Sequence, residues 1–513
     1  MKKGLQKYLL PGSCIGILFF FFLAVCKINF SFDPIYFSTD MYTDMRYAVQ
    51  AWEEKSIFPA GWVFGNQLYA VATPVLAAIF YGICGSMNLS MGLASTVMGI
   101  LVAISFCYLL RAFIPRIGAQ LLALTLFMAA TLVFGGPVHE VGGWQLFFTM
   151  SSFYACYAIA AFLAFGCYIR GKWEKKQLFP LILCVFLSFG TGTQSLRQTL
   201  IMALPIACVE LLCILFRLWQ KKEFFTERTR IAAVILVSNL FGVITAKLLN
   251  IPQVEIFGEI TVTGFETPLL SLQQSFANAF TLVGLGNKPP ALILGVMGIF
   301  GLLYLAYRLR ESAESGSLCL LLLTVSLMGV LVLDAFTTMY IRNIYYFLLY
   351  PLLGAVGAVL YSHFGKWLRY GACLLLVVFL LSGAEDKLQP VFEPVSSPDR
   401  YDAVVAYLEE QGIATVYSGW NRGETVGIAS DDRIRCGFWD SPNTPFVPVK
   451  YLCDPAVFEA TPESCAYLFL NSAEANTAIQ AARKKGVELK LLKHFTDTSI
   501  YIYIAEVNLM GKS

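Results

Sequence analysis

The chain has 513 residues, of which 57% are hydrophobic and only 14% are charged. A water-soluble protein of this length needs far more polar surface, so the composition excludes one. The formal net charge of +3 is small for this length and does not indicate a nucleic-acid partner. Apolar runs of about 18 residues or more recur along the chain, which is typical of a polytopic α-helical membrane protein.

The N-terminal stretch MKKGLQKYLLPGSCIGILFFFFLAVC has the basic and apolar parts of a signal peptide. Its apolar part is long and no small-residue cleavage motif follows, so we expect an uncleaved first span. Basic residues mark cytoplasmic loops, and Lys2, Lys3 and Lys7 therefore predict a cytoplasmic N-terminus. Five later basic clusters are expected on the same side, at residues 111–116, 169–176, 217–230, 307–310 and 363–370.

The stretch QLYAVATPVLAAIFYGICG, at 67–85, decides whether this arrangement holds. If it crosses the membrane, Arg111 and Arg116 fall outside and every later basic cluster inverts. Pro74 and the short length before Gly82 favour a helix that does not cross. We therefore expect 67–85 to lie in the outer leaflet or to re-enter. About eleven spans then remain, at 9–27, 89–110, 118–135, 146–168, 178–192, 197–217, 231–250, 290–306, 317–335, 344–361 and 370–384.

The composition changes after the last of these spans. Residues 386–399 are rich in proline and polar side chains, which predicts a linker. It would join a transmembrane domain at 1–385, whose first outer loop is at 28–88, to a small domain at 400–513. Short β-branched runs alternate with helical patterns in that last part. We expect an α/β domain, and the count of spans places it outside the cytoplasm.

This C-terminal domain lacks a nucleophile elbow, a phosphate loop and metal-ligand spacing, so we interpret it as a binding module. Its loop YSGWNRGET at 417–425 is suited to stacking on a sugar, although an ordinary surface turn has the same composition. Its cysteines, Cys436, Cys453 and Cys465, allow at most one disulfide bond and one free thiol. The remaining cysteines lie mostly inside apolar runs, and no CxxC pair or His/Cys cluster suggests zinc or redox chemistry.

The first outer loop contains an amphipathic helical pattern at residues 39–55. Met41, Met45, Ala48 and Trp52 form one apolar stripe at helical spacing. Such a helix can lie in the plane of the membrane surface with its apolar face in the lipid. We therefore expect this stripe to anchor the helix in the outer leaflet.

Asp40 and Asp44 are i, i+4 neighbours on that helix, with Tyr47 on the same face. One interpretation is structural: Asp40 caps the helix. Asp44 is then a solvated charge that pairs with Arg46 or Lys55. The other interpretation is functional, and in it the helix presents a carboxylate to a lipid-linked substrate.

Other ionisable side chains fall in the remaining outer loops, where they are costly to keep unless they face water or each other. His139 and Glu140 follow the third span, Arg197 lies between the fifth and sixth, and Arg342 precedes the tenth. Each arginine can also be a snorkelling or helix-end residue, and the His–Glu pair can be ordinary loop polarity. Asp334 is the only acid that we find near the end of an apolar run.

Several of these segments resemble one family. The run DPIYFSTDMYTDMRYAVQAWEEKSIFP, the helix at 67–85 that ends in FYGICG, and a following span that ends in arginine resemble the integral-membrane glycosyltransferases of the GT-C superfamily. Protein O-mannosyltransferases and lipid A aminoarabinose transferases belong there. IRNIYYFLLYPLL, at 341–353, is similar to a late motif of that superfamily. The Asp–Glu pair of the mannosyltransferases is absent, because Asp40 is followed by Met41.

The resemblance covers most of 1–385 and implies a GT-C fold in the cell membrane. It implies an enzyme that moves a sugar from a polyprenyl-phosphate carrier to an extracytoplasmic acceptor, which is a cell-envelope glycan, a lipid or a protein. Asp40 is the first choice for the general base and Asp44 the second. Arg197 and Arg342 would bind the leaving phosphate, since arginine pairs with phosphate in bidentate geometry.

His139, Glu140 and Tyr345 complete the substrate site that the resemblance implies. Whether a metal takes part stays open. Asp40 and Asp44, with Glu140 nearby, offer the oxygen ligands that Mg²⁺ or Mn²⁺ prefers. Many members of the superfamily are thought to need no metal.

Two other classes of function remain open. A polytopic transporter or lipid-linked-glycan flippase often has broken spans at matching positions in two halves, and usually keeps acids near the membrane midplane. We find no such matching pair of spans. A non-catalytic membrane protein with a partner-binding outer domain would not need acids gathered on one loop helix.

Overall fold

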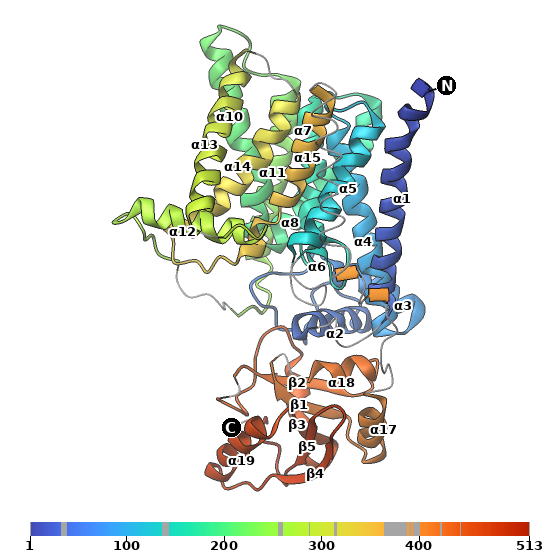
Figure 1. Cartoon of the computed structure of the whole chain (residues 1–513). Helices are drawn as coiled ribbons and strands as arrows, with labels where there is room; N and C mark the ends of the chain where they lie inside the picture. The colour runs from blue at the N-terminus through green and yellow to red at the C-terminus, as the bar shows by residue number, and fades with distance from the viewer. Residues whose placement is uncertain are drawn as a thin grey trace.

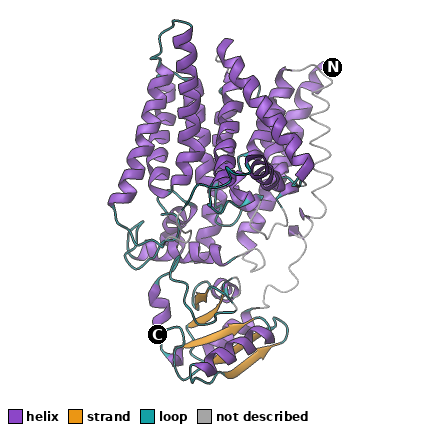
Figure 2. Cartoon of the chain, turned by 90° about the vertical axis from the view of Figure 1, so that its left-hand side faces the viewer, coloured by secondary structure: helices purple, strands orange, loops and turns teal. Residues whose placement is uncertain are grey.

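The computed structural model describes residues 2–31, 38–135, 143–254, 260–286, 288–311, 315–363, 387–388, 391–392, 401–420, 423–441 and 443–511. The described chain has two parts, a bundle of long helices and a small domain below it that contains a five-stranded sheet (Figure 1). Figure 2 shows the bundle helices standing upright and the strands gathered in the smaller domain. This confirms the predicted helical polytopic fold with a small α/β domain at its C-terminal end.

The bundle is built from long apolar helices joined by short segments. The long helices are α1 (Lys2–Ser31), α4 (Met87–Leu110), α5 (Ile117–Phe134), α7 (Ala155–Arg170), α8 (Lys175–Gln194), α10 (Leu204–Trp219), α11 (Glu227–Leu248), α13 (Lys288–Glu311), α14 (Ser315–Phe336) and α15 (Leu349–His363). Shorter elements connect them: α2 (Thr39–Glu53), α3 (Thr73–Cys84), α6 (Trp144–Phe147), α9 (Leu196–Gln198), the π-helical turn η2 (Thr199–Ala203), α12 (Pro268–Thr281) and the 3₁₀ turn η3 (Asn343–Tyr346).

Within the described residues, 8 helices are long and apolar enough to cross a membrane. Two further predicted spans correspond to shorter apolar helices, Ala155–Arg170 and Gly295–Tyr307. The last predicted span, 370–384, lies outside the described residues, as does most of the predicted linker at 386–399. The chain is therefore a multi-pass membrane protein.

The predicted span at 146–168 is wrong at its start, because continuous helix begins only at Ala155. Before it, Met150, Ser151 and Ser152 have positive φ, a conformation that a helix does not allow. Asn29 of α1 holds this buried stretch. Its side-chain oxygen accepts from the Met150 N–H at 2.9 Å, and its amide donates to the Phe148 carbonyl at 3.2 Å. A side chain from another helix thus supplies the hydrogen bonds that a helical turn would have made.

The segment 67–85 forms no span. Its helix α3 has 12 residues, which at 1.5 Å per residue covers about 18 Å of a hydrocarbon core about 30 Å thick. It lies beside α2 at the end of the bundle that faces the C-terminal domain, and the N-terminus of the chain lies at the opposite end (Figure 1). Which end faces the cytoplasm stays a prediction.

Helix α2 runs across the lower end of the bundle, between the bundle and the C-terminal domain (Figure 1). The amphipathic helix is confirmed, but the predicted contact of its apolar stripe with lipid is wrong for three of its four residues. Met41, Met45 and Ala48 are at most 1% exposed, since α3 and α4 pack against this helix. Trp52 lies against Gly82 of α3, where an added Cβ would come within 2.2 Å of its ring. Met41, Met45 and Ala48 therefore belong to the protein core, whereas Trp52, at the end of the stripe, is 37% exposed.

The C-terminal domain has a mixed sheet in the order β2-β1-β3-β5-β4, in which β2, β1 and β3 are parallel and β5 is antiparallel to both its neighbours. The hydrophobic core continues from the bundle through α2 into this sheet. Cys436, Cys453 and Cys465 are all free thiols. The elements are α17 (Asp402–Glu410), β1 (Thr415–Gly419), α18 (Glu424–Ala429), β2 (Arg435–Trp439), β3 (Cys465–Phe469), α19 (Ser472–Lys484), β4 (Lys490–Phe495) and β5 (Ile500–Ile504).

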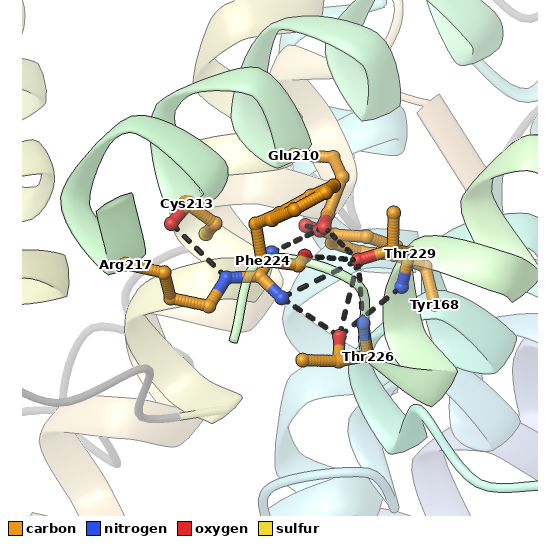
Figure 3. A network of polar contacts seen from close by, with 7 residues as sticks. All are labelled: Tyr168, Glu210, Cys213, Arg217, Phe224, Thr226 and Thr229. Atoms are coloured by element: carbon orange, nitrogen blue, oxygen red, sulfur yellow. Dashed lines mark hydrogen bonds and ion pairs between the residues drawn. The ribbon is translucent and has the colours of Figure 1, made fainter. Parts of the chain in front are cut away.

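A buried polar network joins α7, α10 and α11 near the end of the bundle away from this domain (Figure 3). Glu210 of α10 forms an ion pair with Arg217. It also accepts hydrogen bonds from the hydroxyls of Thr229 and Tyr168, each at 2.7 Å. Glu210, which the sequence analysis does not single out, thus lies inside a span and is 5% exposed. Its charge is tolerated there because the arginine and two hydroxyls compensate it.

The sidedness of the membrane can be tested with added cysteines. We expect a membrane-impermeant thiol reagent on intact cells to label Ser472→Cys, at the exposed start of α19, and to spare Lys175→Cys, at the start of α8. The protein without an added cysteine gives the background from native thiols. Labelling of the second variant with protection of the first would invert the topology.

The Glu210 network predicts a large loss of stability from one substitution. Glu210→Ala leaves Arg217 without its carboxylate, and breaking a buried pair costs about 3–5 kcal/mol. The midpoint of thermal unfolding in detergent should therefore fall clearly. Lys172→Ala is the matched control, because Lys172 belongs to an exposed pair at 3.7 Å whose loss costs at most about 1 kcal/mol. Equal midpoints for the two variants would contradict the assigned role of the network.

Candidate functional site

An open cavity lies where α2 meets the lower end of the bundle and the C-terminal domain. Its volume, counted out to its mouth, is about 840 Å³. Two carboxylates and two guanidinium groups line it together with aromatic and polar side chains. The lining residues are Asp40, Asp44, Asn66, Gln67, Tyr69, Phe153, Tyr154, Arg197, Arg342, Ile344, Tyr345 and Leu452.

The two acids stand one turn apart on α2 and line the same cavity. The structural interpretation of Asp40 is wrong, because Ser38 is the N-cap of α2 and no side chain caps the helix. Asp44 is not a solvated charge either, since it is 4% exposed. It accepts a hydrogen bond from the Tyr69 hydroxyl at 2.6 Å.

Neither cation that the sequence offers to Asp44 is bound to it. Arg46 forms an ion pair with Asp432 of the C-terminal domain. Lys55 lies over the ring of Trp52, with its Nζ atom 3.4 Å from the centroid. The Asp44 carboxylate therefore depends on the Tyr69 hydroxyl rather than on an opposite charge.

Burial raises the pKa of Asp44 to about 7, although the hydrogen bond from Tyr69 lowers it in part and the charge of Asp40 raises it. Burial also raises the pKa of Asp40, and the positive charge of Arg342 opposes this shift. Two carboxyl groups this close in a poorly solvated site titrate as a coupled pair. Part of that titration falls near neutral pH, where a general base works best.

The two arginines approach the cavity from other parts of the chain. Arg197 lies in α9, where its guanidinium stacks over the Tyr345 ring at 4.1 Å and donates to the Tyr154 hydroxyl at 3.4 Å. Arg342 is the N-cap residue of η3 and is exposed, and its charge acts on Asp40. Within the described part of the chain, neither arginine forms an ion pair with a carboxylate. Both are therefore available to an anionic ligand.

The structure brings five of the predicted site residues to this cavity: Asp40, Asp44, Arg197, Arg342 and Tyr345. His139 and Glu140 lie outside the described residues, so their roles stay predictions.

The described residues contain no group of three or more His, Cys, Asp or Glu side chains that could hold a metal ion. Asp40 and Asp44 supply only two carboxylates, and Glu140, the third expected ligand, is outside the described residues. Whether Mg²⁺ or Mn²⁺ binds at this site therefore stays open, and we assign no step to a metal.

Sequence patterns do not point to Tyr69, Tyr154 or Leu452. Tyr69 falls in an apolar stretch next to α3, and Tyr154 falls in the stretch expected to be a span at 146–168. Leu452 comes from the C-terminal domain, which no local pattern places beside α2. The run FGNQ just before Leu68 ends in two polar residues, and this was the available sequence signal that the segment lines a solvent-accessible cavity.

The described residues of the loop at 417–425 do not line this cavity. Tyr417 is buried in β1, whereas Trp420 lines a second cavity of about 460 Å³ between α2 and the C-terminal domain. The rings of Phe438 and Tyr451 lie 5.6 and 5.9 Å from that of Trp420. Sugar stacking on this loop stays a prediction.

No family model matches the chain, and no curated protein sequence matches it. Solved structures do resemble it. The crystal structure of ArnT from Cupriavidus metallidurans in the apo state has a TM-score of 0.54, with 12% identity over 98% of this chain and 99% of that chain. The structure of the same enzyme bound to undecaprenyl phosphate has a TM-score of 0.50, with 11% identity over 99% of both chains.

The Archaeoglobus fulgidus oligosaccharyltransferase in complex with Zn and sulfate has a TM-score of 0.41, with 13% identity over 82% of this chain and 62% of that chain. At 12% identity the likeness to ArnT, an aminoarabinose transferase, is one of fold. The length of the match means that it includes both the bundle and the C-terminal domain. The chain thus shares the fold of ArnT over nearly its whole length.

Proposed function

We propose that this chain is a membrane glycosyltransferase that transfers a sugar from a polyprenyl-phosphate carrier to an acceptor outside the cytoplasm. The observation that carries the proposal is the meeting of two carboxylates and two arginines without carboxylate partners in one cavity at the end of the bundle. The GT-C fold supports it, and so does the undecaprenyl phosphate bound to ArnT, which has this fold.

The arginines suit the phosphate of the donor. A guanidinium offers a planar pair of donors to phosphate oxygens, and its charge neutralises the negative charge that develops as the phosphate leaves. The guanidinium of Arg197 is already oriented by two contacts: it stacks on the Tyr345 ring and donates a hydrogen bond to the Tyr154 hydroxyl. Such a fixed group needs little reorganisation when the sugar–phosphate bond breaks.

The acids suit the acceptor. In the proposed step an acceptor hydroxyl oxygen bonds to the anomeric carbon, and the bond from that carbon to the phosphate oxygen breaks. The electron pair leaves with the polyprenyl phosphate, and the hydroxyl proton passes to Asp40. Asp40 is half-buried and can meet an acceptor, whereas Asp44 is 4% exposed and already bonded to Tyr69. Asp44 then acts mainly through its charge, which sets how readily Asp40 accepts the proton.

The acceptor class is a cell-envelope glycan, a lipid or a protein. Its route to Asp40 runs through the open cavity, whose lining includes Leu452 of the C-terminal domain. His139 and Glu140, which the sequence assigns to the same site, would add polar contacts to either substrate.

Asp40→Asn tests the general base directly. Asparagine keeps the size of the side chain but cannot take the proton, so the rate of sugar transfer should fall by about 10²–10⁴. Binding of undecaprenyl phosphate should persist, because the arginines are unchanged. The assay uses membranes of a strain without the gene, which contain donor and acceptor, and follows the sugar-loaded carrier by mass spectrometry. Glu53→Gln, an exposed acid on the same helix, is the control.

If Asp40→Asn transfers sugar at the wild-type rate, Asp40 is not the general base, and the assignment passes to Asp44 or is withdrawn. If the wild type moves the sugar-loaded carrier across the membrane but transfers no sugar, the protein is a flippase and the proposed transferase function is wrong.

The pH dependence tests the link between Tyr69 and Asp44. The raised pKa of Asp44 predicts that the transfer rate falls on the acid side of about pH 7, as protons bind to the carboxyl pair. The Tyr69 hydrogen bond favours the ionised form of Asp44, so Tyr69→Phe should raise this pKa further and move the acid limb to higher pH. Tyr81→Phe on α3 should leave the limb in place. A limb that stays fixed or moves to lower pH in Tyr69→Phe would contradict the assignment.

A further inference from the structure

The face of α2 that points away from the cavity belongs to Tyr42 and Arg46. These residues lie about 200° around the helix from Asp40 and Asp44, since successive residues of a helix turn by about 100°. They are 1% and 8% exposed, so this face is buried as well. The helix that presents the acids is therefore enclosed on both sides, by the bundle and by the C-terminal domain.

Asp432 of the C-terminal domain binds both residues of this face. It forms an ion pair with Arg46 and accepts a hydrogen bond from the Tyr42 hydroxyl at 3.3 Å. The same hydroxyl accepts from the backbone N–H of Cys436 in β2 at 2.9 Å. The Arg46 and Asp432 side chains are only 10% and 12% exposed, so removing one of them leaves the other as a buried charge without compensation.

Neighbouring contacts hold the same turn against the bundle. Asp431 accepts from the backbone N–H of Asn88, at the start of α4, at 2.8 Å. The Asn88 amide donates in turn to the carbonyl of Ile428 at 2.8 Å. Closer to the start of α2, the Thr39 hydroxyl donates to Glu424 at 3.0 Å. The turn after α18 thus contacts α2 and α4 at once.

The backbone of this turn adopts a conformation that residues other than glycine seldom take. Asp431 and Asp432 have φ values of 48° and 68°. Their N–H groups donate to the carbonyls of Ile428 and Gly427 and so end α18. Aspartate tolerates the left-handed region better than most residues, and strained residues of this kind persist where the surrounding structure imposes them. Here the strain turns two consecutive carboxylates toward the membrane domain.

Gly427 makes the close contact with α2 possible. A Cβ atom added to it would lie 2.4 Å from the Tyr42 ring, which is too close without a shift. The residue has ordinary helical φ within α18, so alanine would suit the helix itself. An alanine at this position should therefore push α18 and α2 apart without disturbing the helix α18 itself.

The same domain also forms part of the cavity wall. Leu452 lines the cavity that contains Asp40. The next residue, Cys453, accepts a hydrogen bond through its carbonyl from the N–H of Val63, in the segment after α2, at 3.0 Å. The C-terminal domain thus touches the catalytic helix, the segment that follows it and the cavity itself.

We infer that the C-terminal domain is a built-in part of the active site, and that Tyr42, Arg46 and Asp432 are positioning residues. They set the place of α2, and through it the place of the two carboxylates against the substrates. A displacement of about 1 Å in a reacting group can cost about a hundredfold in rate, so a small shift of α2 is enough to matter. This inference rests on the proposed function for its activity readout.

The test uses Gly427→Ala and Asp432→Asn in the full-length protein, with Gly298→Ala as the matched control. Gly298 lies in helix α13, where an added Cβ meets nothing within 4 Å. Hydrogen–deuterium exchange should increase in the peptides of α2 in both test variants. At saturating donor, the transfer rate should fall by about ten- to a hundredfold. The acid limb of its pH profile should also move, and binding of undecaprenyl phosphate should stay within about twofold.

Each outcome has one meaning. Faster exchange in α2 with an unchanged rate and pH profile would make the contact merely structural and overturn the inference. Unchanged exchange in both variants would overturn it too, because the domain would then not hold the helix. Faster exchange in α2, together with a wild type that transfers no sugar in membranes containing donor and acceptor, would sink the proposed function and leave the domain contact in place.

Discussion

A buried charged side chain is costly unless another group compensates it, and helix α2 is arranged around this constraint. On one face Asp44 relies on the Tyr69 hydroxyl. On the other, Arg46 relies on Asp432, which lies in a different domain. Neither face could be buried if the bundle or the C-terminal domain were absent. The two domains and the helix between them therefore form one structural unit.

The same constraint separates charges that are compensated inside the protein from charges that are not. Glu210, inside a span, is compensated by Arg217 and two hydroxyls. Asp334, at the end of α14, accepts hydrogen bonds from an asparagine amide and a tyrosine hydroxyl. Arg197 and Arg342, by contrast, have no carboxylate partner within the described residues. Two arginines without carboxylate partners beside a cavity are consistent with a site in which a bound anionic ligand supplies the compensating negative charge.

The arrangement of the cavity also explains why its acids can hold and release protons. Asp44 is buried without a cation, so its carboxyl group stays protonated at higher pH than an exposed aspartate would. Burial raises the pKa of Asp40 as well, but there the positive charge of Arg342 opposes the shift. Two acids of one residue type, one turn apart, thus differ in character because their surroundings differ. The C-terminal domain takes part in those surroundings through Leu452.

The sequence by itself determined what depends on local periodicity and composition. Apolar runs predicted the spans, the short segment at 67–85 was recognised as non-crossing, and alternating patterns predicted the α/β domain. Helical spacing placed Asp40 and Asp44 on one face of α2. The predicted outer loops, together with the family resemblance, pointed to Arg197 and Arg342. These features follow from side chains a few residues apart, which a pattern can register.

Only the tertiary structure decided which distant groups compensate one another. Arg46 meets Asp432 across 386 positions, and Tyr69 meets Asp44 across 25. An amphipathic stripe looks the same whether lipid or protein covers it, so the burial of Met41 and Met45 under α3 and α4 could not be predicted. The broken start of α7 depends in the same way on Asn29 from α1. Hydrogen bonds and ion pairs of this kind leave no periodic signal, because each partner is chosen by the packing of elements far apart in the chain.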